Sequence, residues 1–131
     1  MSSSAVMTVF RASFALLLAL LCLLPGTSST AAGIATAAAA CSIPHKGEHL
    51  GPTYLTSLSV SGTSCSTGLT VVREYHNCQL KRGGSKAKCT SRVDGFLCSE
   101  KRGPSIPTEY YSNVSCQSGA KRVNYKYSQF T

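Results

Sequence analysis

The stretch from Tyr54 to Asn77, YLTSLSVSGTSCSTGLTVVREYHN, decides the fold because its periodicity changes part-way along. Residues 54–61 alternate between two sets, as the two faces of a half-buried strand do. One set is Tyr54, Thr56, Leu58 and Val60, and the other is Leu55, Ser57, Ser59 and Ser61. After a turn at Gly62 and Thr63, Ser64 is a favourable N-cap, and the next stripe recurs at helical spacing: Cys65, Leu69, Val72 and His76. We therefore expect a strand over 54–61 and an amphipathic helix over 65–77.

Three further strands are expected after this helix. The polar segment KRGGSKAK at 81–88 indicates a loop, and a strand over 89–98, bent at Asp94-Gly95, follows it. Pro104 and Pro107 mark another loop, and strands over 110–116 and 122–129 flank a turn at 117–120. On the last strand one face carries Val123, Tyr125 and Tyr127, and the other carries Arg122, Asn124 and Lys126. The order strand-helix-strand-strand-strand predicts an α+β domain, with one helix packed on a small antiparallel sheet.

The N-terminus has the three-part pattern of a secretory signal peptide. Arg11 precedes the apolar run Phe14 to Leu24, after which Pro25 and Gly26 break the helix and small residues follow. The run is shorter than the roughly 20 residues needed to span a bilayer. We expect a secreted, extracellular protein in which residues 1–40 are the signal peptide and a low-complexity Ala/Ser/Thr tether. Residues 41–131 then form one basic domain. Cleavage after Ala32 or within 37–40 remains open, as does acylation of Cys41 as a lipoprotein.

Seven cysteines are present, and Cys22 lies within the predicted signal peptide. The other six predict three disulfides, since an even count in an exported chain indicates a disulfide framework. The six are Cys41, Cys65, Cys78, Cys89, Cys98 and Cys116.

Geometry excludes two of the possible cysteine pairs. The ends of the expected helix, at Cys65 and Cys78, lie roughly 20 Å apart along its axis, beyond the limit of about 7 Å between bridged Cα atoms. Cys89 and Cys98 are too far apart on one strand. Several complete sets of three disulfides remain open. We favour the set that joins Cys78 to Cys89, Cys65 to Cys98, and Cys41 to Cys116.

Three short segments resemble a group of small secreted proteins common in actinobacteria. They are VSGTSCSTGLTVV at 60–72, VDGFLC at 93–98 and VSCQSGAKRV at 114–123. The resemblance implies a Cys-opened helix, a Gly-aromatic-x-Cys strand and a final Val-x-Cys strand with a basic turn. It supports the fold and export, and it brings no active site.

A nucleophilic-cysteine reaction is one alternative. Cys65-Ser66-Thr67-Gly68-Leu69 at a helix start, with Tyr75 beyond it, resembles the nucleophile segment of secreted cysteine peptidases of the cell-wall hydrolase type. A helix N-terminus stabilises a thiolate, but such an enzyme needs a histidine base on a later strand. No histidine follows His76, and Ser64 stands where an Asp usually precedes the nucleophile. A disulfide is the simpler role for Cys65.

Two other sets of residues have the side chains of a functional site but not the spacing. Cys41, His45 and His49 are zinc-ligand types, but Pro44 and Gly47 interrupt any common helical face. Glu74 and His76 are the residue types of a ribonuclease, but positions two apart on a helix point about 200° apart. We expect His76 to border the core and Glu74 to face solvent, and we predict no catalytic residue, metal or cofactor.

The charge balance is the strongest functional signal. The sequence contains thirteen Lys and Arg residues but five Asp and Glu residues. Such an excess of positive charge attracts anionic partners. The predicted binding residues lie in expected loops and turns: Lys81, Arg82, Lys86, Lys88, Lys121 and Arg122. Lys101-Arg102 is a further basic pair in an expected loop. We expect a non-enzymatic binding module for an anionic envelope polymer or an acidic protein, with nucleic acid a weaker candidate. A small secreted hydrolase, a secreted inhibitor and a merely solvated basic surface are the alternatives.

Overall fold

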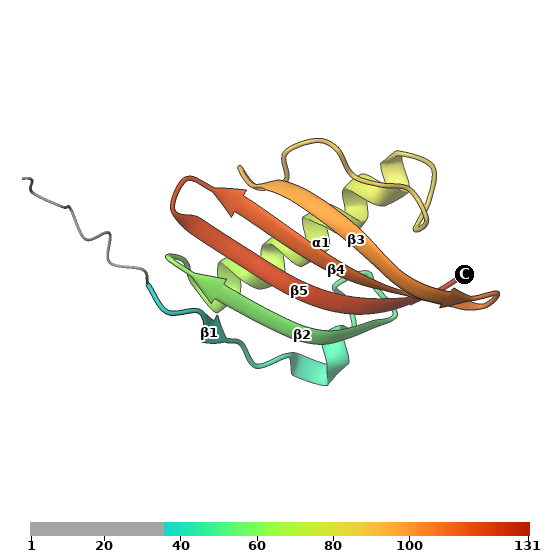
Figure 1. The fold of residues 1–131 in the computed structure, drawn as a ribbon, viewed down its shortest axis with the longest axis horizontal. Helices are drawn as coiled ribbons and strands as arrows, with labels where there is room; N and C mark the ends of the chain where they lie inside the picture. Colours follow the sequence, from blue (N-terminus) through green and yellow to red (C-terminus); the bar gives the residue numbers. More distant parts are fainter. Residues whose placement is uncertain (1–35) are drawn as a thin grey trace, which may run out of the picture. The chain divides into compact units, whose positions relative to one another are not determined.

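The computed structural model describes residues 36–131 and confirms the α+β fold, with one helix packed on an antiparallel sheet (Figure 1). The elements in chain order are β1 (Ala39–Ala40), the 3-10 helix η1 (Pro44–Gly47), β2 (Tyr54–Ser61), α1 (Cys65–Lys81), β3 (Leu97–Ile106), β4 (Glu109–Ser118) and β5 (Lys121–Phe130). The strand order is β1-β2-β5-β4-β3, and each neighbouring pair is antiparallel. The predicted signal peptide and most of the predicted tether lie outside the described residues. None of the helices between residues 36 and 131 has the length and apolar character needed to cross a membrane.

Helix α1 begins where the sequence predicts. The Ser64 hydroxyl accepts a hydrogen bond from the Thr67 backbone N–H at 3.1 Å, which caps the helix. Gly68 lets the helix approach β2 closely, because a Cβ at this position would lie 2.9 Å from Val60 Cγ1. The helix continues past the expected end at residue 77 to Lys81, because Gln79 adds a buried contact. Gly83 and Gly84, both with positive φ, then turn the chain away.

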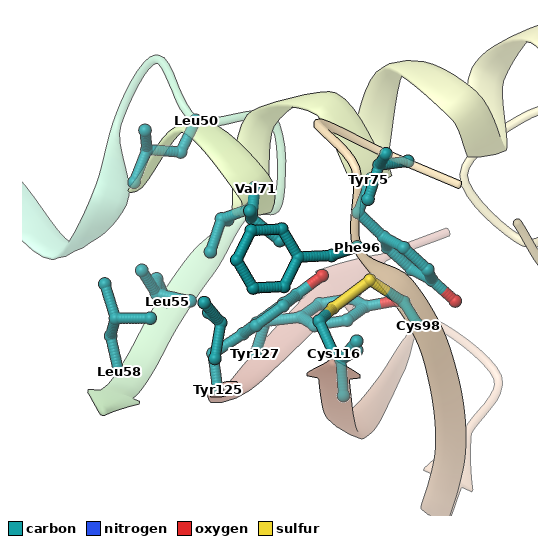
Figure 2. Close-up of a cluster of buried hydrophobic side chains, with 14 of the residues drawn as sticks. Leu50, Leu55, Leu58, Val71, Tyr75, Phe96, Cys98, Cys116, Tyr125 and Tyr127 are labelled. Carbon is teal, nitrogen blue, oxygen red and sulfur yellow. A yellow bond between two sulfur atoms is a disulfide. The ribbon is translucent and has the colours of Figure 1, made fainter. Parts of the chain in front are cut away.

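The core lies between α1 and the sheet. Figure 2 shows Leu55 and Leu58 of β2 near Val71 of the helix, with the rings of Tyr125 and Tyr127 in the same cluster. The predicted inward face of the last strand is confirmed, since its aromatic residues and Val123 are buried.

The predicted alternation of β2 is wrong in its first half. Leu55 and Leu58 both face the core, whereas Tyr54 is exposed. A register irregularity between Leu55 and Ser57 in the pairing with β5 explains the change. A bulge places one extra residue in the strand, so the alternation reverses across Thr56.

The strand expected over 89–98 is also wrong. Residues 90–96 form a loop, closed by an isolated bridge between Val93 and Phe96 around Asp94 and Gly95, which both have positive φ. The strand β3 starts at Leu97 and continues through the expected loop to Ile106. Pro104 is tolerated because it lies at a register irregularity on an edge strand, where no ladder N–H is required.

Three disulfides are present, of which one pairing was predicted correctly. Cys78 bonds Cys89, as expected. Cys41 bonds Cys65 and Cys98 bonds Cys116, so the pairings of Cys65 with Cys98 and of Cys41 with Cys116 are wrong.

The register of the sheet accounts for the two corrected pairs. Cys98 and Cys116 lie directly opposite each other on β3 and β4, with Cα atoms 4.0 Å apart. The Cys41 backbone N–H donates to the Leu58 carbonyl, which holds Cys41 beside β2. The turn after β2 brings Cys65 to the same end, with the two Cα atoms 5.6 Å apart.

Candidate functional site

The face of the sheet opposite α1, here called the open face, carries two rows of polar side chains. In Figure 1 this face lies in front of the helix. The first row crosses β2, β5, β4 and β3 through Ser57, Lys126, Asn113 and Lys101. The second row crosses the same strands through Ser59, Asn124, Ser115 and Ser99. Ser59 is half-buried and the other seven residues are exposed.

These two rows line a hollow of about 420 Å³. Its floor also includes Glu100, Val114 and Tyr125, whose side chains face the core. The twist of a sheet gives its face a concave diagonal. The hollow is therefore a shallow, strand-built depression in which polar side chains stand on a hydrogen-bonded backbone.

The first row places two positive charges on either side of Asn113. Neighbouring strands lie about 4.8 Å apart, so the Cα atoms of Lys101 and Lys126 are roughly 10 Å apart. Neither row contains a carboxylate. Glu109 shares the open face but is four residues along β4 from Asn113, about 14 Å away. Among the described residues, one ion pair forms, between Arg102 and Glu100. Neither lysine is paired with a carboxylate there, so both are available to an anion.

The hydroxyl and amide groups of the second row are partly linked to one another. Ser115 Oγ donates to Asn124 Oδ1 at 2.7 Å, and Ser99 Oγ donates to the Ser115 carbonyl at 3.5 Å. Side chains of these types both donate and accept hydrogen bonds. The site can therefore bind a ligand that carries hydroxyl groups as well as negative charge.

One end of the open face is aromatic. Tyr54 and Phe130 pack edge to face, with ring centroids 5.6 Å apart, and both are exposed. Tyr111 of β4 is 51 % exposed. It pairs with Ser128 of the neighbouring strand β5, and Ser128 pairs with Tyr54 of β2 on its other side. Lys46 Nζ lies 5.9 Å from the centroid of the Tyr54 ring. A polar, positively charged centre thus adjoins an aromatic end on the same face.

One of the predicted binding residues belongs to this face. Arg122 lies in a third row, opposite Ser61 on one side and Gln117 on the other, next to the row of Asn124. Its Nη1 is buried and makes no hydrogen bond to any residue from 36 to 131. Lys121 lies at the β4–β5 turn.

The four predicted residues of the helix end and the basic loop are spread over separate hollows. Lys81 and Arg82 border one hollow, Lys86 borders a second and Lys88 a third. Arg82 Nη2 also donates to Ser91 Oγ at 2.6 Å, which fixes the loop to the helix end. Their role in binding stays a prediction.

Glu100 is the residue that sequence reasoning missed most clearly. Its side chain is 1 % exposed and accepts hydrogen bonds from five side chains on both layers of the fold. The donors are Tyr75 and Gln79 on α1, Arg102 on β3, Ser112 on β4 and Tyr127 on β5.

These donors keep Glu100 ionised in the core. Burial by itself would raise the pKa of Glu100, but the hydrogen bonds from Arg102, Ser112 and Tyr127 outweigh burial and hold that pKa below its ordinary value. Burial, and the nearby carboxylate, also raise the pKa of the Tyr75 hydroxyl. The network joins donors on α1 to donors on three strands, so it ties the helix to the sheet.

Residues 36–131 do not bring together the groups that the cysteine-peptidase and zinc alternatives need. Cys41 and Cys65 are bonded to each other, so neither is a thiolate nucleophile or a zinc ligand in this state. Within residues 36–131, no three His, Cys, Asp or Glu side chains gather as metal ligands do. His76 is 8 % exposed and packs against Gly51, where a Cβ would lie 2.2 Å from His76 Cδ2.

Comparisons of the chain with protein-family models, with curated proteins and with solved structures found no match. The functional assignment therefore rests on the geometry of the open face.

Proposed function

We propose that this protein is a secreted, non-enzymatic module that binds an anionic polymer through the open face of its sheet. The observation that carries the proposal is the placing of Lys101 and Lys126 on either side of Asn113, within two rows of serine and asparagine that contain no carboxylate. The apolar leader and the three disulfides support export, because disulfides persist in oxidising compartments.

The site is well suited to binding because its backbone is already ordered. Each lysine stands on a strand that is hydrogen-bonded within the sheet, and the Cys98–Cys116 bond ties β3 to β4 beside the second row. Binding then orders only side chains, and a smaller ordering cost leaves more of the interaction energy as affinity. Arg122, in the next row, extends the positive surface along β5.

The composition of the two rows supports binding over hydrolysis. General acid–base catalysis needs a group that exchanges a proton near the working pH, most often His, Asp or Glu. The two rows contain Ser, Asn and Lys alone. His76 and the Glu100 carboxylate lie on the core side of the sheet, where a polymer on the open face does not reach them.

The test compares two variants that lose the same charge. Lys101→Gln/Lys126→Gln removes the pair on the open face, and Lys86→Gln/Lys88→Gln removes two charges from the loop. Binding of dextran sulfate to the secreted protein is measured by titration at low and at physiological salt. At about 1 kcal/mol for each lysine contact, the open-face variant should bind roughly 10- to 30-fold more weakly, and the loop variant should stay within about 3-fold.

Wild-type affinity should also fall steeply as salt rises. Equal losses in the two variants, or a loss confined to the loop variant, would refute the open-face site, and no binding to the polyanion at low salt would refute the proposal as a whole.

A further inference from the structure

We infer that the polymer is an anionic polysaccharide that runs along β4, with one sugar ring on Tyr111 and a neighbouring acidic group between Lys101 and Lys126. This inference rests on the proposed function and names the ligand of the same face. It adds Tyr111 as a stacking subsite, separate from the charges that attract the polymer.

Tyr111 and Asn113 are two residues apart on β4, so both point to the open face. Their Cα atoms are about 7 Å apart along the strand. A chain lying along β4 therefore meets the aromatic ring at one position and the pair of lysines at the next. This spacing suits a polymer in which rings and acidic groups alternate at short intervals.

The smallest side chains in the sheet flank Tyr111. Ser128 is its partner on β5, and on β3 the irregular stretch between Arg102 and Ser105 places Gly103 beside it. A Cβ at Gly103 would lie 3.9 Å from Tyr111 Cβ, so the two residues are in close proximity. Neither neighbour has a side chain long enough to cover the ring, which agrees with its exposed fraction of 51 %.

The polar groups of the face favour a polysaccharide over a nucleic acid. The two rows supply six serine and asparagine side chains and two lysines, which suits a ligand that carries free hydroxyl groups beside each acidic group. Single-stranded nucleic acid carries one charge per nucleotide and is bound by a strongly basic groove with several successive stacking rings. Here Tyr54 and Phe130 pack edge to face on each other and so form no run of parallel stacking rings, and Tyr111 is two residues along β4 from Asn113.

The experiment measures four probes against the secreted protein at low salt: polygalacturonate, neutral dextran, polyphosphate and oligo(dT). Tyr111→Ser is compared with Leu80→Ser, which removes a similarly exposed apolar side chain from α1. Both side chains are about half exposed, so both variants should fold, which a thermal unfolding curve checks. Tyr111→Ser should weaken polygalacturonate binding at least 5-fold and change polyphosphate binding less than 2-fold, whereas Leu80→Ser should change neither. Dextran should bind at least 10-fold more weakly than polygalacturonate.

A polygalacturonate affinity that Tyr111→Ser leaves unchanged would overturn the stacking subsite. Tighter binding of oligo(dT) than of polygalacturonate, dependent on Tyr111, would overturn the choice of polysaccharide in favour of nucleic acid. In both cases, weaker polymer binding by Lys101→Gln/Lys126→Gln would still support the proposed function. If Lys101→Gln/Lys126→Gln weakens the binding of neither polygalacturonate nor polyphosphate, the proposed function itself fails.

Discussion

Glu100→Gln should destabilise the fold strongly, because a buried carboxylate holds donors from the helix and from three strands. One carboxylate oxygen, Oε1, accepts from Arg102 Nε at 3.0 Å, Ser112 Oγ at 2.6 Å and Tyr127 OH at 2.8 Å. The other, Oε2, accepts from Tyr75 OH at 3.1 Å and Gln79 Nε2 at 3.4 Å. Glutamine has one oxygen and one NH₂ group in these positions. Whichever way its amide is turned, the NH₂ group faces Arg102, which lies beside both carboxylate oxygens and whose guanidinium cannot accept a hydrogen bond.

The size of the effect follows from these contacts. Removing one partner of a fully buried ion pair costs about 3–5 kcal/mol. Arg102 is 28 % exposed, so water compensates part of the loss, and we expect the free energy of unfolding to fall by about 2–4 kcal/mol. Urea unfolding at pH 7 with the disulfides intact measures it, with Glu109→Gln as a matched control that should change stability by less than about 0.5 kcal/mol.

The same residue should set the acid limb of stability. The folded pKa of Glu100 lies below its ordinary value, so its contribution is present above that ordinary value and is lost as the pH falls through the folded pKa. Glu100→Gln should flatten this limb. A loss below about 1 kcal/mol at pH 7, together with an unchanged acid limb, would refute the reasoning that the carboxylate ties helix to sheet.

The remaining predictions concern three other features. Burial lowers the pKa of His76, so the unfolded state binds protons more readily, and stability should decline as the pH falls below about 6.5. Urea midpoints between pH 5 and 8 should show this slope in the wild type and lose it in His76→Phe, with polymer binding unchanged. Replacing Cys78 and Cys89 together by Ser should cost on the order of 3 kcal/mol without weakening open-face binding, and a thiol-alkylating reagent should label no cysteine of the folded, unreduced protein. Gly68→Ala should cost about 1–3 kcal/mol, because the new Cβ meets Val60 Cγ1 at 2.9 Å; an unchanged melting temperature would contradict the close packing.

Local sequence patterns were enough to predict the elements with strong periodicity. The helix start at Ser64, the last strand and the Cys78–Cys89 bond were all predicted correctly. Each depends on residues close together in the chain: a cap three residues from its donor, an alternation of aromatic side chains, and a short loop between two cysteines.

Most of the errors have a different cause, since they depend on partners far along the chain. The other two disulfides follow from how β2, β3 and β4 are registered, which no local pattern specifies. The bulge at Thr56 is visible only in the pairing with β5. Glu100 was missed because its donors come from four separate elements, and residues 99–106 were expected to be largely loop.

The candidate site was half visible in the sequence. The outward set Arg122, Asn124 and Lys126 was predicted as one face of the last strand, and Arg122 was named as a binding residue. Lys101 was placed in a loop, so its position in the same row as Lys126 could not be found without the register of β3 on β4. Charges that are close together in the sequence predicted a binding site in the loop at 81–88. The sheet instead places Lys101 and Lys126, which are 25 residues apart, in one row.

Amide chemical-shift mapping of the isotope-labelled, disulfide-bonded protein, titrated with polygalacturonate at low salt, is the most direct test of the open-face site. The largest shifts should fall on the amides of the two rows: Ser57, Ser59, Ser99, Lys101, Asn113, Ser115, Asn124 and Lys126. The amides of α1 should move little, because the helix lies on the other side of the sheet. Shifts confined to residues 81–92, with none in the two rows, would contradict the open-face site.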